Sequence, residues 1–282
     1  MRKNIAKGVV FFSSIAVLLY FLIYHDATSV ASAIIIALCI NIISAPFYFF
    51  IIEGLSNLGK IGLFWRSYVV YRNEDVRLSI SYLFRIRVND KYLLVKNRKG
   101  NYYQLVGGTY KTLPGFEKIQ QKYCIKSDRR FETSSGIAKG DLRFRLPGKF
   151  VMDIIKWFHS REDRETDQWR EFCEELLTPG ILDKHIFRYI NHRYELTLQT
   201  PMRKAKNIDC QEILIYEIFD LLPNNEQTKS LTDLMAKGDT DEIKWADQYL
   251  IERLGFNERD KSTEYEIGAH TKWAIFEKWS EE

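Results

Sequence analysis

The sequence predicts a two-helix transmembrane hairpin followed by one mixed α/β domain. Three observations support this expectation. Two long stretches near the N-terminus, 8–24 and 27–52, contain no charged residue. Short apolar and alternating segments, typical of β-strands, begin near Val76. Amphipathic patterns with helical spacing, such as 149–159, lie between and after those strands. Helices that alternate with strands in one chain indicate an α/β fold with a mixed sheet.

Composition narrows the class of protein. The 282 residues carry 41 Lys and Arg against 37 Asp and Glu, a net charge of +4, which excludes a strongly basic DNA-binding protein. The 46% hydrophobic and 14% aromatic content excludes a disordered chain. The four cysteines form no Cys-x-x-Cys pair, so neither a zinc site nor a disulfide framework is predicted.

The predicted hairpin consists of spans at about 8–25 and 27–52. The uncharged runs within them would extend roughly 25 and 39 Å as helices, against a hydrocarbon core of about 30 Å. Lys and Arg flank both spans but are absent between them, so the positive-inside rule places both termini and the following domain in the cytoplasm. The alternative is a signal peptide cleaved near Ala31-Ser32-Ala33. We prefer the hairpin because a second span follows at once.

Residues 53–75 are predicted to be a linker and 76–282 a single domain. Strands are expected at 83–88, 91–96, 102–106, 142–146, 185–200 and 211–221. Helices are expected at 149–159, 161–177 and 241–254. Glycines, prolines and charges between the third and fourth strands predict a loop-rich insertion at about 109–160.

One predicted helix concentrates acidic residues. Glu171, Glu174 and Glu175 are three and four positions apart, so their carboxylates share one helix face. Arg170 precedes Glu174 by four residues and can pair with it. Clustered carboxylates are hard ligands that suit Mg²⁺ or Mn²⁺. The alternative is a solvated charged helix face, the usual fate of such a run.

These residues resemble a known motif. Arg170-Glu171-Phe172-Cys173-Glu174-Glu175 is similar to the R-E-U-x-E-E part of the Nudix box, with Glu162 at the position of an earlier glutamate. The segments 92–98 and 103–108, the second ending in Gly107-Gly108, resemble the strand pair before that box, and 243–245 resembles the start of a late helix of the family. The resemblance covers about 80–275 and implies a Nudix α/β/α sandwich. Leu177 stands where the box has a glycine, and this departure favours ligand sensing over hydrolysis.

The combination of a hairpin with this domain resembles the two-transmembrane Nudix effectors of bacterial CBASS antiphage systems. That resemblance implies that a partner cyclase makes a cyclic oligonucleotide, which the Nudix-like domain binds. The effector would then oligomerise and disrupt the lipids of the inner membrane, which causes abortive infection. The implied location is the bacterial inner membrane, multi-pass, with both termini cytoplasmic.

A cyclic oligonucleotide requires cations for its phosphates and flat rings for its bases. The candidates for these roles are Arg85, Arg87, Arg143, Arg145, Arg193, Trp169, Tyr110 and Tyr194. For each of them a surface charge or a core ring is the alternative. The alternative function is a membrane-anchored Nudix hydrolase that cleaves nucleoside diphosphate-linked substrates with Mg²⁺. Its catalytic groups would be Glu171, Glu174, Glu175, Arg170 and Glu162.

Overall fold

The computed structural model describes residues 13–20, 23, 32–40, 59–98, 100–128, 139–206, 208–258 and 260–280. The chain divides into two compact units, Met1–Gly62 and Leu63–Glu282. We describe each unit by itself, and the second unit holds the sheet and the candidate site.

The predicted transmembrane hairpin is wrong. Among the residues that the structure describes, no helix is both long and apolar enough to cross a bilayer. The multi-pass inner-membrane location depends on those spans and is corrected with them. Parts of the predicted spans, within 8–12, 21–22, 24–31 and 41–52, lie outside the described residues.

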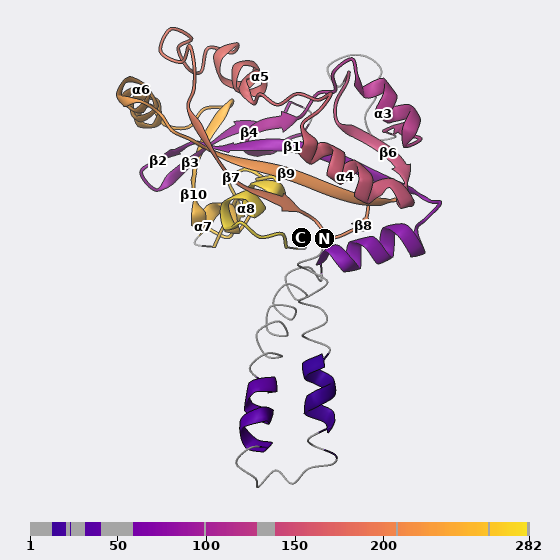
Figure 1. Cartoon of the computed structure of the whole chain (residues 1–282). Helices are drawn as coiled ribbons and strands as arrows, with labels where there is room; N and C mark the ends of the chain where they lie inside the picture. The colour runs from indigo at the N-terminus through magenta and orange to yellow at the C-terminus, as the bar shows by residue number, and fades with distance from the viewer. Residues whose placement is uncertain are drawn as a thin grey trace. The chain divides into compact units, whose positions relative to one another are not determined.

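The second unit is built around strand β1 (Asp75–Arg85) (Figure 1). One edge of β1 pairs in parallel with β9 (Gln211–Leu221), from Val76 opposite Gln211 to Arg85 opposite Asp220. The other edge is shared. Its first half pairs antiparallel with β6 (Arg143–Pro147) and its second half with β4 (Tyr103–Thr109). The sheet therefore divides into two branches along this edge.

The remaining strands extend these branches. β3 (Lys91–Lys96) pairs with β4, and β10 (Ile243–Asp247) and β2 (Arg87–Val88) pair with β3. β5 (Lys126–Ser127) pairs with β6. On the far side, β7 (His192–Gln199) and β8 (Arg203–Lys204) pair with β9. A separate small hairpin joins β11 (Phe256–Asn257) to β12 (Ser262–Thr263).

Alternation along β1 separates two faces of the sheet. Val76, Leu78 and Ile80 belong to the larger hydrophobic core, whereas Arg77, Ser79 and Ser81 point to the opposite face. The helical elements on the core face include α4 (Val151–Ser160), α5 (Trp169–Phe172), η4 (Cys173–Leu177) and α6 (Asn225–Ala236). The second core packs on the opposite face with α7 (Gln248–Glu252) and α8 (Ala269–Phe276). Helices thus cover both faces of a large mixed sheet, which confirms the mixed α/β part of the predicted fold.

Two predicted helices differ from the structure. Residues 161–168 are not helical, because Arg161 and Asp163 adopt left-handed backbone angles (φ 63° and 53°) that end α4. Residues 243–247 form β10, not the start of a helix, and only Gln248–Glu252 is helical. The sequence analysis did not predict the helical elements η1 (Trp65–Val70), α3 (Phe116–Lys122), α6 and α8, nor the two-residue strands β5, β8, β11 and β12. The 3-10 turn η3 (Gly148–Phe150) precedes α4 where the predicted helix 149–159 was expected to begin.

Candidate functional site

A polar cleft with a volume of about 590 Å³ lies over the face of β1 that carries Arg77, Ser79 and Ser81. Its floor comes from the alternating residues of β1 and β9, such as Ser79 and Ser81 beside Leu214 and Tyr216. Its walls come from β4, β6, β8, the α5–η4 segment and α8. The volume falls in the range of about 300 to 1,000 Å³ that is usual for small-molecule sites.

The predicted acidic helix supplies one wall of this cleft. Glu171, Glu174 and Glu175 all line it, while Phe172 and Leu176 of the same segment are buried in the core. As the three- and four-residue spacing predicts, the carboxylates lie on one side of this segment and the apolar groups lie on the other.

Two glycines of β4 allow this wall to approach the sheet. A Cβ at Gly108 would collide with the Glu171 carboxylate, and a Cβ at Gly107 would collide with the Tyr82 carbonyl. Gly107 also has a φ of 148°, which disfavours any other residue. Its N–H donates to Glu175 Oε2 at 2.8 Å. The Gly-Gly pair thus serves close packing of the acidic segment on the strand.

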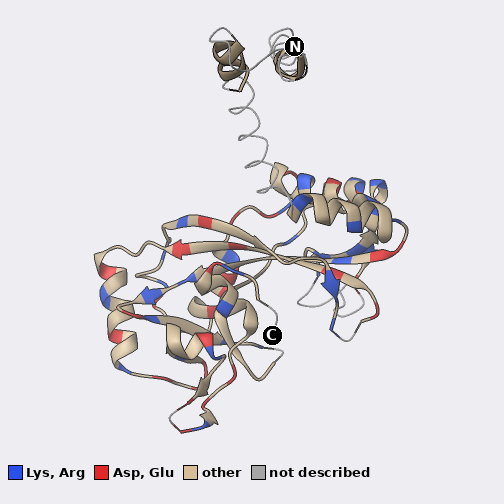
Figure 2. Cartoon of the chain, turned by 90° about the horizontal axis from the view of Figure 1, so that it is seen from below, with Lys and Arg blue, Asp and Glu red and all other residues tan. Residues whose placement is uncertain are grey.

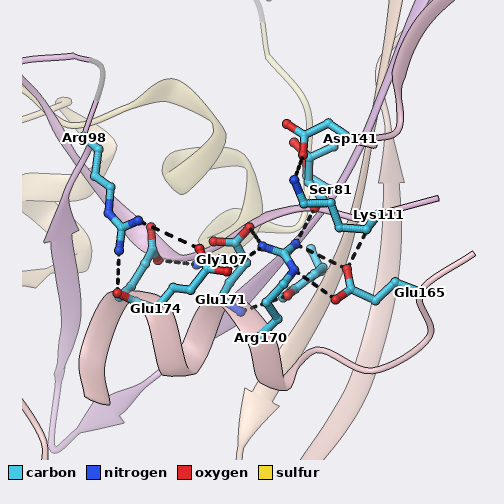
Figure 3. A network of polar contacts seen from close by, with 12 residues as sticks. Ser81, Arg98, Gly107, Lys111, Asp141, Glu165, Arg170, Glu171 and Glu174 are labelled. Atoms are coloured by element: carbon cyan, nitrogen blue, oxygen red, sulfur yellow. Dashed lines mark hydrogen bonds and ion pairs between the residues drawn. The ribbon is translucent and has the colours of Figure 1, made fainter. Parts of the chain in front are cut away.

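Arg170 organises the carboxylates (Figure 3). Its Nη1 lies 2.6 Å from Glu171 Oε1 and 3.3 Å from Glu174 Oε1. Its Nε donates to Glu165 Oε1 at 3.0 Å, and its Nη2 donates to the Thr109 carbonyl at 2.8 Å. Burial lowers the pKa of Arg170, but the hydrogen bond to Glu165 and the charge of Glu171 outweigh it and raise the pKa overall. Arg170 therefore stays charged and neutralises this wall.

The carboxylates differ in their protonation. Burial raises the pKa of Glu175 to about 8, and the negative charge of Glu171 adds to the rise. Burial also raises the pKa of Glu171, although Arg170 opposes it. Within the described parts of the chain, no group of three or more His, Cys, Asp or Glu side chains is arranged to hold a metal ion. Cationic side chains neutralise two of these glutamates, because the Arg170 guanidinium contacts Glu171 and Glu174, and Arg98 Nη1 lies 3.8 Å from Glu174 Oε2.

Another part of the cleft holds three arginines, each with a carboxylate partner. Arg77 pairs with Asp128 Oδ2 at 2.9 Å and with Glu212 Oε2 at 3.0 Å, and all three side chains are buried. Arg203 reaches the same Glu212 at 3.2 Å. Arg143 Nη1 lies 3.4 Å from Asp141 Oδ2. Burial lowers the pKa of Arg143, and the neighbouring charge of Arg77 lowers it further.

The structure brings only some of the predicted ligand-binding residues together in the cleft. Arg143 lines the cleft together with Arg170 and the three glutamates. Glu162 is exposed, and Glu165 instead contacts Arg170. The other candidates do not line the cleft, and their contacts are elsewhere. Arg85 pairs with Asp220 and Glu277, Arg145 with Asp75, and Arg193 with Glu195; Arg87 donates to the Asn89 carbonyl, Trp169 stacks on Phe172, Tyr110 donates to Glu217, and Tyr194 contacts Thr197.

Sequence reasoning missed several residues of the cleft. Arg77, Ser79 and Ser81 alternate with apolar residues, and this period of two along β1 could have shown a polar sheet face. The residues missed without such a signal are Arg98, Lys111, Arg203, Tyr216, His270 and Trp273, because they reach the cleft through pairings between distant segments.

Comparison with known proteins agrees with this architecture. A family model described as the SMODS-associated NUDIX domain matches residues 75–275. The match spans the sheet from β1 and ends within α8. Among curated proteins, none matches the chain.

Proposed function

Because the chain belongs to the family of SMODS-associated NUDIX domains, we propose that it is an effector of a CBASS antiphage system whose cleft senses a cyclic oligonucleotide. The family match supports a Nudix-domain protein associated with antiphage defence. The cyclic oligonucleotide as the bound molecule is our proposal and goes beyond the family match. It rests on the residues of the cleft and on the motif resemblance described above.

The observation that carries the proposal is the convergence of three arginines, one of them buried, on one open cleft. Arg77 extends from β1, Arg143 from β6 and Arg203 from β8, so three strands direct guanidinium groups to one site. Basic and acidic residues are otherwise interleaved along the strands (Figure 2). A phosphodiester bound at this site would receive hydrogen bonds from charged donors, the strongest kind available to a phosphate.

Arg143 is the best-placed phosphate ligand. Arg77 is held between Asp128 and Glu212, and Arg203 shares Glu212, so both have close carboxylate partners. Asp141 contacts Arg143 at 3.4 Å and also contacts Lys111 at 2.6 Å, so its charge is divided between two cations. An anionic ligand would offset the desolvation that lowers the pKa of Arg143.

The contacts of the acidic wall, formed by Glu171, Glu174 and Glu175, support ligand sensing better than they support hydrolysis. Arg170 contacts both Glu171 and Glu174, and Arg98 donates to the Glu174 carbonyl at 2.5 Å. These contacts neutralise Glu171 and Glu174, while Glu175 accepts from the Gly107 N–H. Hydrolysis remains the alternative for the same glutamates, and it is measured below in the same samples.

The proposal includes two partners. A cyclase, which joins nucleotides through phosphodiester bonds, supplies the ligand. The ligand-bound chain then associates with further copies of itself. Sedimentation of the full chain with and without ligand tests the second step, and an unchanged sedimentation coefficient at saturation would remove it.

The first test is a thermal unfolding screen of the full chain with cyclic di-, tri- and tetranucleotides. A ligand at one hundred times its Kd stabilises the folded state by about 2.7 kcal/mol, which raises Tm by several degrees. We expect at least one cyclic oligonucleotide to do so. Chromatography of the same samples with Mg²⁺ should return the ligand intact. A panel without any shift would refute sensing, and Mg²⁺-dependent turnover that Glu174→Gln abolishes would favour the hydrolase.

A further inference from the structure

Four aromatic side chains line the cleft between β4, β9 and α8. The rings of Tyr216 and His270 are stacked, with centroids 5.8 Å apart and planes 8° from parallel. Tyr102 meets His270 edge-to-face at 6.2 Å, and Trp273 meets Tyr216 in the same way at 6.3 Å. We call these four residues the aromatic subsite.

The aromatic subsite opens to the cleft. Tyr102, Tyr216 and His270 are only half-buried, unlike the core rings of Tyr82 and Phe84. Each of the three lines the cleft, so part of each ring remains available to a molecule that enters it. Trp273, in contrast, is buried, so it forms the base of the cluster beneath the three accessible rings.

A glycine holds the subsite in shape. Gly268 begins α8, and its N–H donates to the Tyr103 carbonyl at 2.9 Å. A Cβ at this position would lie 2.6 Å from His270 Cε1 and 3.0 Å from Tyr102 Cε2, too close for either ring. The backbone of α8 is thus fixed against β4 at the point where the two rings meet.

Polar groups border the rings. Gln104 Oε1 accepts from Asn97 Nδ2 at 2.9 Å and lies 3.2 Å from His270 Nε2. Amide and imidazole edges of this kind form hydrogen bonds with the edges of nucleobases. Arg203 lies over the Trp273 ring, 5.4 Å from its centroid, so a phosphate-binding cation adjoins the rings.

We propose that the aromatic subsite binds a nucleobase of the ligand, while Arg203 and Arg143 hold the adjacent phosphate. This inference rests on the proposed function and adds the location of the base. The flat faces supply stacking, and the contact between Gln104 and His270 fixes the orientation of the imidazole ring beside them. The subsite and the acidic wall come from different elements, since the rings belong to Tyr102, β9 and α8, whereas the glutamates belong to α5 and η4.

The test compares two probes that share a triphosphate and differ in the base. ATP and inorganic tripolyphosphate are titrated calorimetrically into the full chain. Stacking on aromatic rings favours ATP, and we expect it to bind on the order of tenfold more tightly. His270→Ala should reduce this preference to less than about twofold without changing tripolyphosphate binding, and His270→Phe, which keeps a flat ring, should restore much of it.

Equal affinities of the wild-type chain for ATP and tripolyphosphate would overturn the subsite, as would an absence of binding by both. An equal loss for both probes in His270→Ala would also overturn it. The cyclic-oligonucleotide screen separates the two proposals. If cyclic oligonucleotides bind and His270→Ala binds them as tightly as the wild type, the subsite is wrong and sensing stands. If none binds, both proposals fall.

Discussion

At the scale of single residues, the Tyr110 hydroxyl forms a buried polar contact in the core. The Tyr110 hydroxyl donates to Glu217 and accepts from Gln168 Nε2 at 3.0 Å, and all three residues are buried. Tyr110→Phe removes the donor and leaves the Glu217 carboxylate buried without it. We expect a loss of about 1 to 3 kcal/mol in the free energy of unfolding, measured by urea denaturation.

Tyr194→Phe is the matched control for that substitution. The Tyr194 hydroxyl contacts Thr197 Oγ1 at 2.8 Å on an exposed part of β7. Water can replace this contact, so the change should be within about 0.5 kcal/mol. Equal effects of the two substitutions would show that the Tyr110 contact has no special importance for stability.

Glu175 gives a prediction about pH. Burial raises the pKa of its carboxyl to about 8, whereas the unfolded chain releases this proton near the ordinary value of 4.5. The folded state therefore binds more protons over this interval, so the contribution of Glu175 to stability is complete below about pH 4.5 and is lost as the pH rises towards 8. Glu175→Gln should remove this part of the pH dependence, so the variant should gain stability relative to the wild type between pH 5 and 8. If the Tm values of the wild type and of Glu175→Gln changed with pH in parallel, this prediction would be contradicted.

The acidic wall was predictable at the residue scale, while most cationic groups were not. Glu171, Glu174 and Glu175 reach the cleft because helical spacing is a local property of the sequence. Arg143 and Arg145 looked equivalent in the sequence, yet Asp75 binds Arg145 at 2.5 Å outside the cleft. Which arginine finds a carboxylate depends on strand pairing between distant segments, and no local pattern records it.

At the scale of elements, the close approach of β4 to β1 depends on Gly107. With a φ of 148° and the Tyr82 carbonyl beside its Cα, any side chain at this position strains the backbone and separates the strands. Gly107→Ala should lower the free energy of unfolding by about 1 to 3 kcal/mol, or more if the strands separate, as measured by chemical denaturation.

Gly62→Ala is the control, because Gly62 is helical and the Cβ it would gain meets no atom within 4 Å outside its own helix backbone and chain neighbours. This change should be neutral or stabilising by up to about 1 kcal/mol. If Gly107→Ala were as well tolerated as Gly62→Ala, the close contact between β4 and β1 would not limit stability.

How well each helix or strand was predicted depended mainly on how clear its local sequence pattern is. β3 and β9 have the predicted bounds, since each is an apolar run between polar residues. Residues 243–247 fit a strand and a helix equally well by pattern, and pairing with β3 made them a strand. Helix α6 escaped prediction although Asn224 and Gln227 form a capping box, a signal that was present in the sequence.

At the scale of the whole molecule, a nearly neutral chain gathers charge of both signs around one cleft. The net charge of +4 gave no indication of this, because acidic and basic residues are interleaved along the strands (Figure 2). The motif resemblance identified the Nudix part correctly, and the family match over residues 75–275 confirms it. The predicted spans failed because uncharged length alone was taken as sufficient, whereas no described helix is long and apolar enough to cross a bilayer.

The most direct test of the central claim is calorimetric titration of a cyclic oligonucleotide, selected by the thermal screen, into three full chains. These are the wild type, Arg143→Gln in the cleft and Arg87→Gln outside it. Loss of one charged hydrogen bond to phosphate should weaken binding by roughly tenfold or more in Arg143→Gln and leave Arg87→Gln within about twofold of the wild type. Equal affinity of all three chains, or no binding by the wild type, would contradict the account.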